Sequence, residues 1–451
     1  MLSATNNPAT SPDDAQLARR VTWLCRLLGL GVIALIGVTW RLWTPQDLFP
    51  RVPLFAWPPP RWWDWASLLV LAAGSLGLLT GAQHLPVRRL SAAAIACGFA
   101  VQFLADQHRL QPWAWQFFIL ATVIALADDR LVFRGWFLLV CMIYAWSAVS
   151  KMDDSFIVPF GHIIERALTA PLQLTGLQWS SMGQWFCHEL ADFFAVCAPA
   201  VEIAIPALAL FPRTRGWGFW LSAAMHLYLV MFLGPWGLGH QPGVLVWNVF
   251  FMAQNALLFR ERSMRFPIRG LGTCDRPLTG ALARTRRGIV EALLAFVMLW
   301  PAVEPWGYCD AWLGWAVYVP RFHRVEVRIA DEALEGPYSF LTEHVQGAGP
   351  WKGYSAPPRT RRVNVSRMSL SLLGVPEYPN HRFAVGVALD WQLRGEGAGL
   401  EVQLFERPNR FRAISRYVRT LTTPAELEAY AQTFRVNALP ESVLRRRAAG
   451  R

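Results

Sequence analysis

The chain has 451 residues, of which 54% are hydrophobic and 16% are charged, and its mean hydropathy is +0.26. Such an apolar composition excludes a purely soluble protein of two or three domains. The formal charge of +12 would suggest nucleic acid as the partner of a soluble protein. Here the arginines lie mostly between apolar windows and in the last third of the chain, where a topology signal and anionic lipid headgroups explain them. We therefore predict a multi-pass membrane protein that contacts lipid and no nucleic acid.

The chain opens with a polar segment, residues 1–20, and long apolar windows follow it. A helix needs about 20 residues to cross a hydrocarbon core about 30 Å thick, and nine windows approach that length. They are 21–40, 66–85, 90–105, 112–127, 131–150, 184–211, 216–233, 243–259 and 288–300. The sixth window is longer than a straight span requires and contains Pro199 and Pro206, so we expect it to be kinked or broken.

The orientation of the spans follows from the arginines. The loop between the eighth and ninth windows carries eight arginines between positions 260 and 287, and the positive-inside rule places it in the cytoplasm. Counting back through eight windows places residues 1–20 in the cytoplasm as well. We therefore predict a membrane domain over 21–310 and an extracytoplasmic domain over 318–451.

The last part of the chain lacks long apolar windows. Partial alternation of apolar and polar residues predicts strands in the segments 321–329, 361–373, 382–393 and 400–405. Thr423 precedes a helical pattern over 424–434 and is a suitable N-cap. The predicted fold class is an all-α polytopic membrane bundle of about nine transmembrane helices, followed by a small extracytoplasmic α+β domain.

Lys151 ends the fifth apolar window, in the stretch CMIYAWSAVSKMDDSF, and is one of only two lysines in the chain, the other being Lys352. An arginine keeps its charge in proteins, whereas a desolvated lysine can lose its proton, so a lysine here indicates a titratable amine. The alternative is a lysine that extends along the helix end to the membrane interface. The segment 156–168 that follows has the spacing of an amphipathic helix lying along that interface.

Two further ionisable residues, Glu202 and His226, lie inside apolar windows. Ionisable groups in a span are costly and usually functional, which makes both catalytic candidates. The alternative is a structural hydrogen bond between helices. No metal site is predicted, because His188–Asp192, HELAD, only approximates the zinc motif HExxH.

The run YAWSAVSKMDDSF resembles the segment that carries the catalytic lysine of vitamin K-dependent γ-carboxylases and of bacterial HTTM (horizontally transferred transmembrane domain) proteins, and Lys151 falls on that lysine. Other segments resemble the family in the same order: DQHRLQPWAWQFFIL, PAVEIAIPALALFPRTR, MHLYLVMFLGPWG and VWNVFFM. Together these segments cover about residues 91–259. DoxX- and MauE-like redox membrane proteins are a neighbouring resemblance.

The resemblance implies a bacterial inner-membrane enzyme in which a neutral Lys151 deprotonates a reduced, vitamin K-like quinone at the outer face. It implies Glu202 and His226 as further catalytic residues. The substrate-binding candidates are Trp113, Gln116, Trp146, Asp153 and Asn248.

The chain departs from the carboxylase pattern in two respects. Gln116 stands where the carboxylase has a histidine, and the C-terminal domain is much shorter. We therefore expect quinone binding without glutamate carboxylation of the animal kind. The alternative function is a non-catalytic or DoxX/MauE-like redox-accessory protein whose helices anchor an extracytoplasmic binding domain; the sequence identifies no protein partner.

Overall fold

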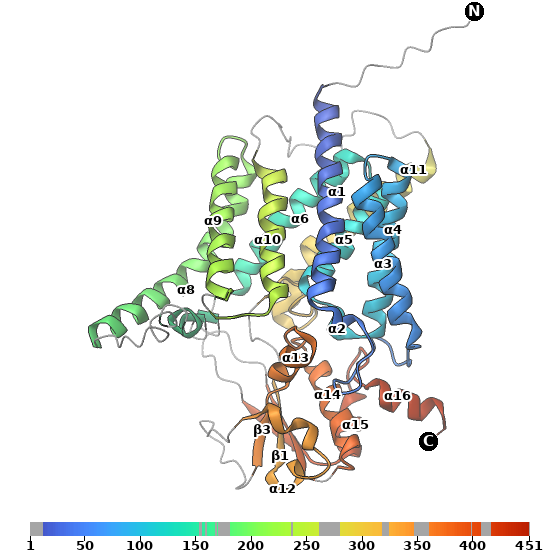
Figure 1. Ribbon diagram of the computed structural model, residues 1–451, viewed down its shortest axis with the longest axis vertical. Helices are drawn as coiled ribbons and strands as arrows, with labels where there is room; N and C mark the ends of the chain where they lie inside the picture. Colours follow the sequence, from blue (N-terminus) through green and yellow to red (C-terminus); the bar gives the residue numbers. More distant parts are fainter. Residues whose placement is uncertain are drawn as a thin grey trace, which may run out of the picture.

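The computed structural model describes residues 12–152, 156–157, 160–166, 169, 181–235, 238–260, 280–317, 324–346, 360–397, 399–406 and 416–450. These residues form a helical bundle with a small α+β domain against one end (Figure 1). The first helix, α1, begins at the opposite end of the bundle. The described part of the predicted segment 1–20 is already helical, because α1 starts at Pro12.

Ten α-helices and two short 3₁₀ helices of the bundle have described bounds at both ends. They are α1 (Pro12–Val38), α2 (Trp40–Trp43), α3 (Trp62–Gly81), α4 (Leu85–Ala105), η1 (Gln107–Arg109), α5 (Pro112–Leu126), α6 (Asp129–Ser150), α8 (Ser181–Leu210), α9 (Arg215–Leu233), α10 (Pro242–Phe259), α11 (Ala281–Leu299) and η2 (Trp300–Trp306). In the described ranges, eight helices are long and apolar enough to cross a membrane, as expected of a multi-pass membrane protein. The exception among the nine predicted windows is α5, whose 15 residues span only about 23 Å.

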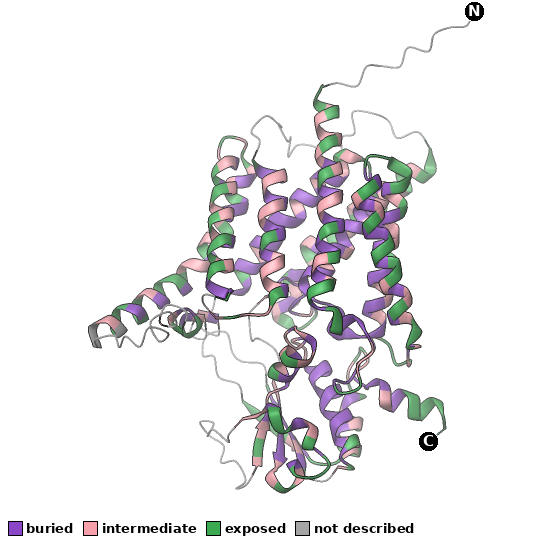
Figure 2. Cartoon of the chain, in the orientation of Figure 1, coloured by how far each residue is buried: buried purple, intermediate pink, exposed green. Residues whose placement is uncertain are grey.

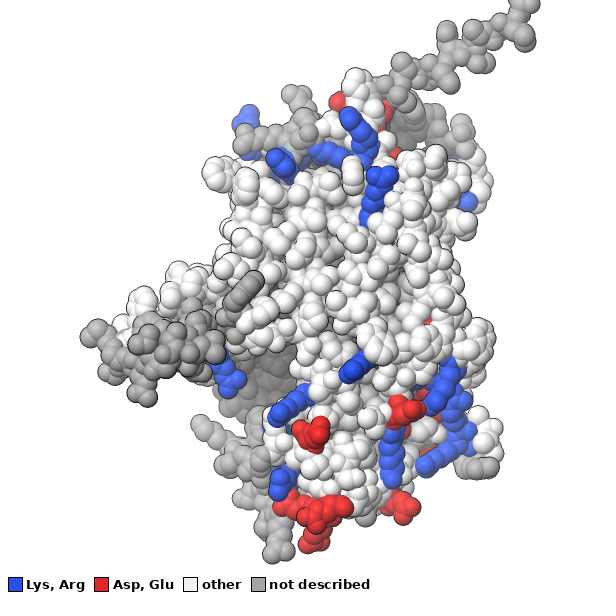
Figure 3. Space-filling view, in the orientation of Figure 1, with Lys and Arg blue, Asp and Glu red and all other residues white. Residues whose placement is uncertain are grey.

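The surface of the bundle suits a lipid environment. Large hydrophobic side chains such as Leu69, Trp217 and Trp220 are exposed on its outside, and Figure 2 shows exposed residues along the outer faces of the helices. Charged residues gather towards the two ends in Figure 3, with an uncharged band between them. An apolar belt of this kind is what a protein surface in contact with acyl chains requires.

Helices α3 and α4 approach each other closely through small residues. A Cβ atom added at Gly74 would lie 2.7 Å from the Ser91 carbonyl oxygen, and one added at Gly98 would lie 2.7 Å from Leu71 Cγ. Without a hydrophobic driving force in lipid, such close backbone contact is a main source of helix association.

Helix α8 is one continuous helix of 30 residues with both Pro199 and Pro206 inside it. Of the expectation that this window is kinked or broken, the break is therefore wrong for the described backbone. At 1.5 Å per residue the helix is about 45 Å long, which exceeds a 30 Å core. Figure 1 shows how the extra length is placed: α8 is inclined to its neighbours, and its N-terminal half projects away from the bundle.

Two further expectations concern segments only partly described. In 156–168, residues 156–157 and 160–166 are helical, as the amphipathic pattern predicts, and the rest of that prediction lies outside the described residues. The arginine-rich loop 260–287 is described only at its ends, where α11 already includes the last three of its arginines.

The C-terminal domain is built on a five-stranded antiparallel sheet of order β2-β3-β1-β4-β5. Its elements are β1 (Arg324–Ala330), α12 (Asp331–Leu334), η3 (Ser339–His344), β2 (Val345–Gln346), β3 (Thr360–Val363), α13 (Val365–Leu373), α14 (His381–Arg394), β4 (Leu400–Phe405), β5 (Tyr417–Leu421), α15 (Pro424–Ala431) and α16 (Glu441–Ala448). The predicted strands 321–329 and 400–405 correspond to β1 and β4. The predicted N-cap Thr423 is confirmed, because its side chain and that of Glu426 form a capping box.

Two predicted strands of this domain are wrong. Most of 361–373 is helix α13, which starts because the Asn364 side chain accepts a hydrogen bond from the Arg367 amide. The whole of 382–393 lies in helix α14, capped in the same way by Asn380. Residues on all sides of α14 are buried, so it has no polar stripe and its sequence lacks the period that distinguishes a surface helix from a buried strand.

Buried ion pairs hold the domain against the bundle. Asp64 in α3 accepts hydrogen bonds from Arg51 at 2.6 Å and from Arg109 at 2.5 Å, and Arg51 also pairs with Glu441 of α16. On the other side of the junction, Asp310 pairs with Arg382 of α14. These ion pairs join elements that are far apart in sequence, so they hold the C-terminal domain in one position against the helices.

The predicted orientation has a direct test. We expect a reporter that is active only outside the cytoplasm to be active when fused after Arg451 and silent when fused at position 270, because the arginines of 260–287 favour the cytoplasm. The measurement is reporter activity normalised to protein level. The reverse pattern of activity would contradict the predicted orientation.

Candidate functional site

Lys151 is the C-cap of α6, and only 5% of it is exposed. Its Nζ donates hydrogen bonds to Ser147 Oγ at 2.7 Å and to Glu202 Oε1 of α8 at 2.5 Å, and it lies 5.8 Å from the centre of the Phe156 ring. The side chain is thus turned towards α8 and packed inside the protein. An ammonium extended along a lipid-facing helix end would instead leave a large part of its stem exposed.

Glu202 presents its second carboxylate oxygen to the interior. Oε2 is buried and accepts no hydrogen bond from the residues that the structure describes. Burying a carboxylate oxygen without a hydrogen-bond donor costs free energy. Glu202 Oε2 can therefore accept a hydrogen bond from a ligand beside the Lys151 amine.

A hydrogen-bonded chain runs beside this pair. Asn255 donates to the Tyr144 hydroxyl at 2.7 Å, and the hydroxyl lies 2.5 Å from His226 Nε2. His226 Nδ1 lies 2.7 Å from Asn248 Oδ1, and Asn248 Nδ2 donates to the Val244 carbonyl. The donors and acceptors therefore all point one way, with the proton of a neutral imidazole on Nδ1 and the Tyr144 hydroxyl donating to Nε2.

The chain and the ion pair form one polar region. Tyr144, Ser147 and Lys151 are spaced by three and four residues on α6, so they share one face of the helix. Lys151 is also close enough to His226 for an electrostatic interaction. Two of the catalytic candidates, Lys151 and Glu202, are in direct contact, and the third lies beside them.

The predicted substrate-binding residues separate into different environments. Asn248 belongs to the His226 chain, as described above. Gln116 lies in a second buried cluster, where its Nε2 donates to Gln254 Oε1 at 3.1 Å and its Oε1 accepts from Trp247 Nε1 at 3.0 Å. Trp136 donates to the same Gln254 oxygen. The nitrogen and the oxygen of the Gln116 amide are thus both hydrogen-bonded to side chains of α10.

Trp146 and Trp113 are not part of this polar region. Trp146 faces α11, where its indole donates to the Met298 carbonyl at 2.9 Å. Trp113 packs edge-on against Trp43 and Phe117. Asp153 lies outside the described residues.

Three residues that sequence reasoning did not select complete the region: Ser147, Ser222 and Asn255. A fourth, Gln254, belongs to the cluster of Gln116. Ser222 accepts a hydrogen bond from Asn255 at 2.9 Å. A signal was available, since Asn248 and Asn255 are polar residues seven apart in one apolar window and therefore share a helix face.

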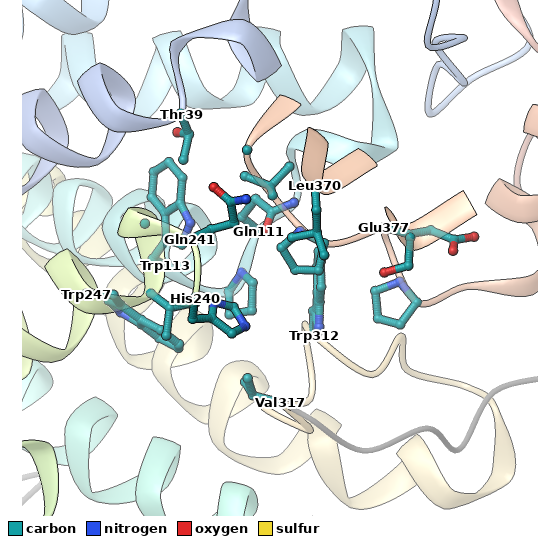
Figure 4. Close-up of a pocket in the computed structure, with 18 of the residues that line it drawn as sticks. Thr39, Gln111, Trp113, His240, Gln241, Trp247, Trp312, Val317, Leu370 and Glu377 are labelled. Carbon is teal, nitrogen blue, oxygen red and sulfur yellow. The ribbon is translucent and has the colours of Figure 1, made fainter. Parts of the chain in front are cut away.

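A cavity of about 400 Å³ lies where the bundle meets the C-terminal domain; we name it the interface cavity. Its walls include Thr39, Gln111, Trp113, His240, Gln241, Val244, Trp247, Trp312, Ser366, Leu370 and Glu377. Figure 4 shows Trp113, Trp247, His240 and Gln241 on one side and Glu377 on the other. The Trp247 indole also donates a hydrogen bond to Gln116, and the Val244 carbonyl accepts one from Asn248 of the His226 chain. The wall of the cavity therefore adjoins both buried clusters.

Comparisons with protein-family models, with curated proteins and with solved structures found no match.

Proposed function

We propose that this multi-pass membrane protein is an enzyme in which Lys151 transfers protons to and from a lipid-soluble, quinol-like substrate. The observation that carries the proposal is the buried contact between Lys151 and Glu202 inside an apolar bundle. Ionisable groups at such positions are expensive to maintain, and they commonly mark proton-transfer or substrate sites in membrane proteins.

The pair can supply the amine that the chemistry needs. The proposal requires that Glu202 takes the proton of Lys151 along the hydrogen bond that joins Nζ to Oε1, because desolvation in an apolar bundle penalises a charged amine and a charged carboxylate alike. In the neutral arrangement, Nζ has a free electron pair. It can break the O–H bond of a bound hydroxyl and keep the proton as an ammonium, which stabilises the oxyanion formed beside it.

The surrounding groups fix the orientation of a second titratable side chain. The Tyr144–His226–Asn248 chain is fully directed: Asn248 holds the imidazole proton on Nδ1, so Nε2 faces the Tyr144 hydroxyl as an acceptor. The interface cavity, with three indoles in its walls, offers a flat apolar ring a route towards this region.

We propose further that the reaction is not glutamate carboxylation of the animal kind. An amide such as that of Gln116 cannot exchange a proton near neutral pH as an imidazole does, and here the amide is engaged with Gln254 and Trp247. A non-catalytic protein whose helices anchor a binding domain is the second candidate. The observation that favours it is the set of buried ion pairs that fix the C-terminal domain on the bundle.

Replacement of Lys151 by arginine separates these readings. We expect Lys151→Arg to lower the rate of quinol deprotonation, or of quinol-dependent oxygen consumption, by about 100-fold or more, because general base catalysis contributes that much and arginine does not deprotonate. The measurement uses purified protein in lipid nanodiscs with a reduced naphthoquinone, together with quinol binding and protein yield.

Ser147→Ala is the matched control, since it removes one hydrogen bond from Nζ but leaves the amine, and its rate should stay within about tenfold of the wild type. An active Lys151→Arg enzyme would exclude the general-base role. Absence of quinol binding at high micromolar concentration would exclude the substrate class, and labelled bicarbonate appearing in a glutamate peptide would exclude the statement on carboxylation.

A further inference from the structure

A second space, in the C-terminal domain, adjoins the interface cavity. This space, of about 280 Å³, is lined by Arg324, Val325, Glu326, Arg362, Val363, Asn364, Val365, Ser366, Glu377 and Ala384, and we name it the arginine pocket. Ser366 and Glu377 line both spaces. Ser366 belongs to α13 and Glu377 to the loop that follows it. This segment therefore lies between the apolar interface cavity and the charged arginine pocket.

The two compartments differ sharply in polarity. The interface cavity has indole, proline and aliphatic walls, and burial lowers the pKa of His240, so its bundle side is uncharged at neutral pH. The arginine pocket places Arg324 of β1 and Arg362 of β3 together. Figure 4 shows the Glu377 carboxyl turned away from Trp113 and Trp247, that is, away from the apolar end.

The arginine pocket offers cationic hydrogen-bond donors, because Arg324 and Arg362 both line it. In the described structure, the Glu326 carboxylate forms ion pairs with both Arg324 and Arg328, each at 2.8 Å. Burial raises the pKa of Glu377 to about 8, so this carboxyl is largely protonated at neutral pH and can donate a hydrogen bond. Arg362 donates to Gln346 at 2.9 Å, and its guanidinium has further N–H groups for a ligand.

We propose that the interface cavity and the arginine pocket form one binding site for an amphiphile with an apolar body and a single acidic head group. The apolar body would occupy the space between Trp113, Trp247 and Trp312. The head, a carboxylate or a phosphate, would lie between Arg324 and Arg362 with the Glu377 hydroxyl as a further donor. This site shares the interface cavity with the proposed route of the quinol, but its head-group end uses none of the residues of proton transfer. Loss of anion preference and loss of quinol deprotonation are therefore measured separately.

The test is photo-crosslinking of the full chain in lipid nanodiscs with three diazirine probes of one alkyl skeleton, ending in a carboxylate, a phosphate monoester or an alcohol. We expect the two anions to label peptides of 366–379 and 240–247 about tenfold more than the alcohol does, because charge-assisted hydrogen bonds discriminate by that order. Preference for one anion over the other identifies the head group.

Variants locate the two ends of the ligand. Arg362→Gln should remove the preference for the anions, whereas Arg361→Gln, on the same strand but pairing with Asp331 at the surface, should keep it. Leu370→Trp should fill the apolar compartment and reduce labelling by all three probes. Equal labelling by acid and alcohol, an unchanged preference in Arg362→Gln, or label confined to lipid-facing helices would each overturn the proposal.

Discussion

Lys151→Met should lower the free energy of unfolding of the bundle by about 3–5 kcal/mol, the usual cost of removing one partner of a buried ion pair. The reason is Glu202: its side chain is 13% exposed, its Oε1 would lose the Lys151 ammonium, and its Oε2 has no donor among the described residues. The measurement is thermal unfolding of the purified protein in a fixed detergent, followed by intrinsic tryptophan fluorescence.

The double variant Lys151→Met/Glu202→Met distinguishes the pair from a general packing effect. Replacing both partners by apolar side chains of similar volume is often neutral or stabilising, so the double variant should recover most of the loss. If Lys151 only extended to the membrane interface, the single variant would unfold like the wild type. A double variant less stable than Lys151→Met would show that the two side chains do not compensate each other.

Asp310→Ala should loosen the C-terminal domain from the bundle by a comparable amount, about 3–5 kcal/mol. Asp310 accepts hydrogen bonds from Tyr378 at 2.7 Å, from Asn380 at 2.7 Å and from both terminal nitrogens of Arg382. Without it, the Arg382 guanidinium, only 11% exposed, would retain the Gln107 side chain as the acceptor of its Nε. Amide hydrogen exchange of α14 and of residues 374–380 should accelerate.

The matched control is Asp331→Ala. Asp331 forms a surface pair with Arg361, with 39% and 53% of the two side chains exposed, and such pairs contribute about 0–1 kcal/mol. Exchange of α14 should therefore stay as in the wild type. Equal exchange in the two variants would mean that the Asp310 contacts do not hold the domain in place.

The sequence by itself determined the features that depend on local composition. The nine apolar windows all contain helices, because the length of an apolar run and its caps are properties of consecutive residues. The N-cap Thr423 was recognisable for the same reason, since its partner Glu426 is three residues away. Lys151, Glu202 and His226 were also recognisable, because an ionisable residue in an apolar window is unusual wherever it points.

Only the tertiary structure decided which of these groups meet. Lys151 and Glu202 are 51 residues apart, and Asp310 and Arg382 are 72 apart, so their pairing depends on how helices and domain pack and not on any local pattern. The same holds for α14, whose burial on all sides removed the polar stripe that would have identified a helix. The interface cavity lies between the bundle and α13 with its following loop, and the arginine pocket lies between α13 and the strands β1 and β3; no periodicity encodes either contact.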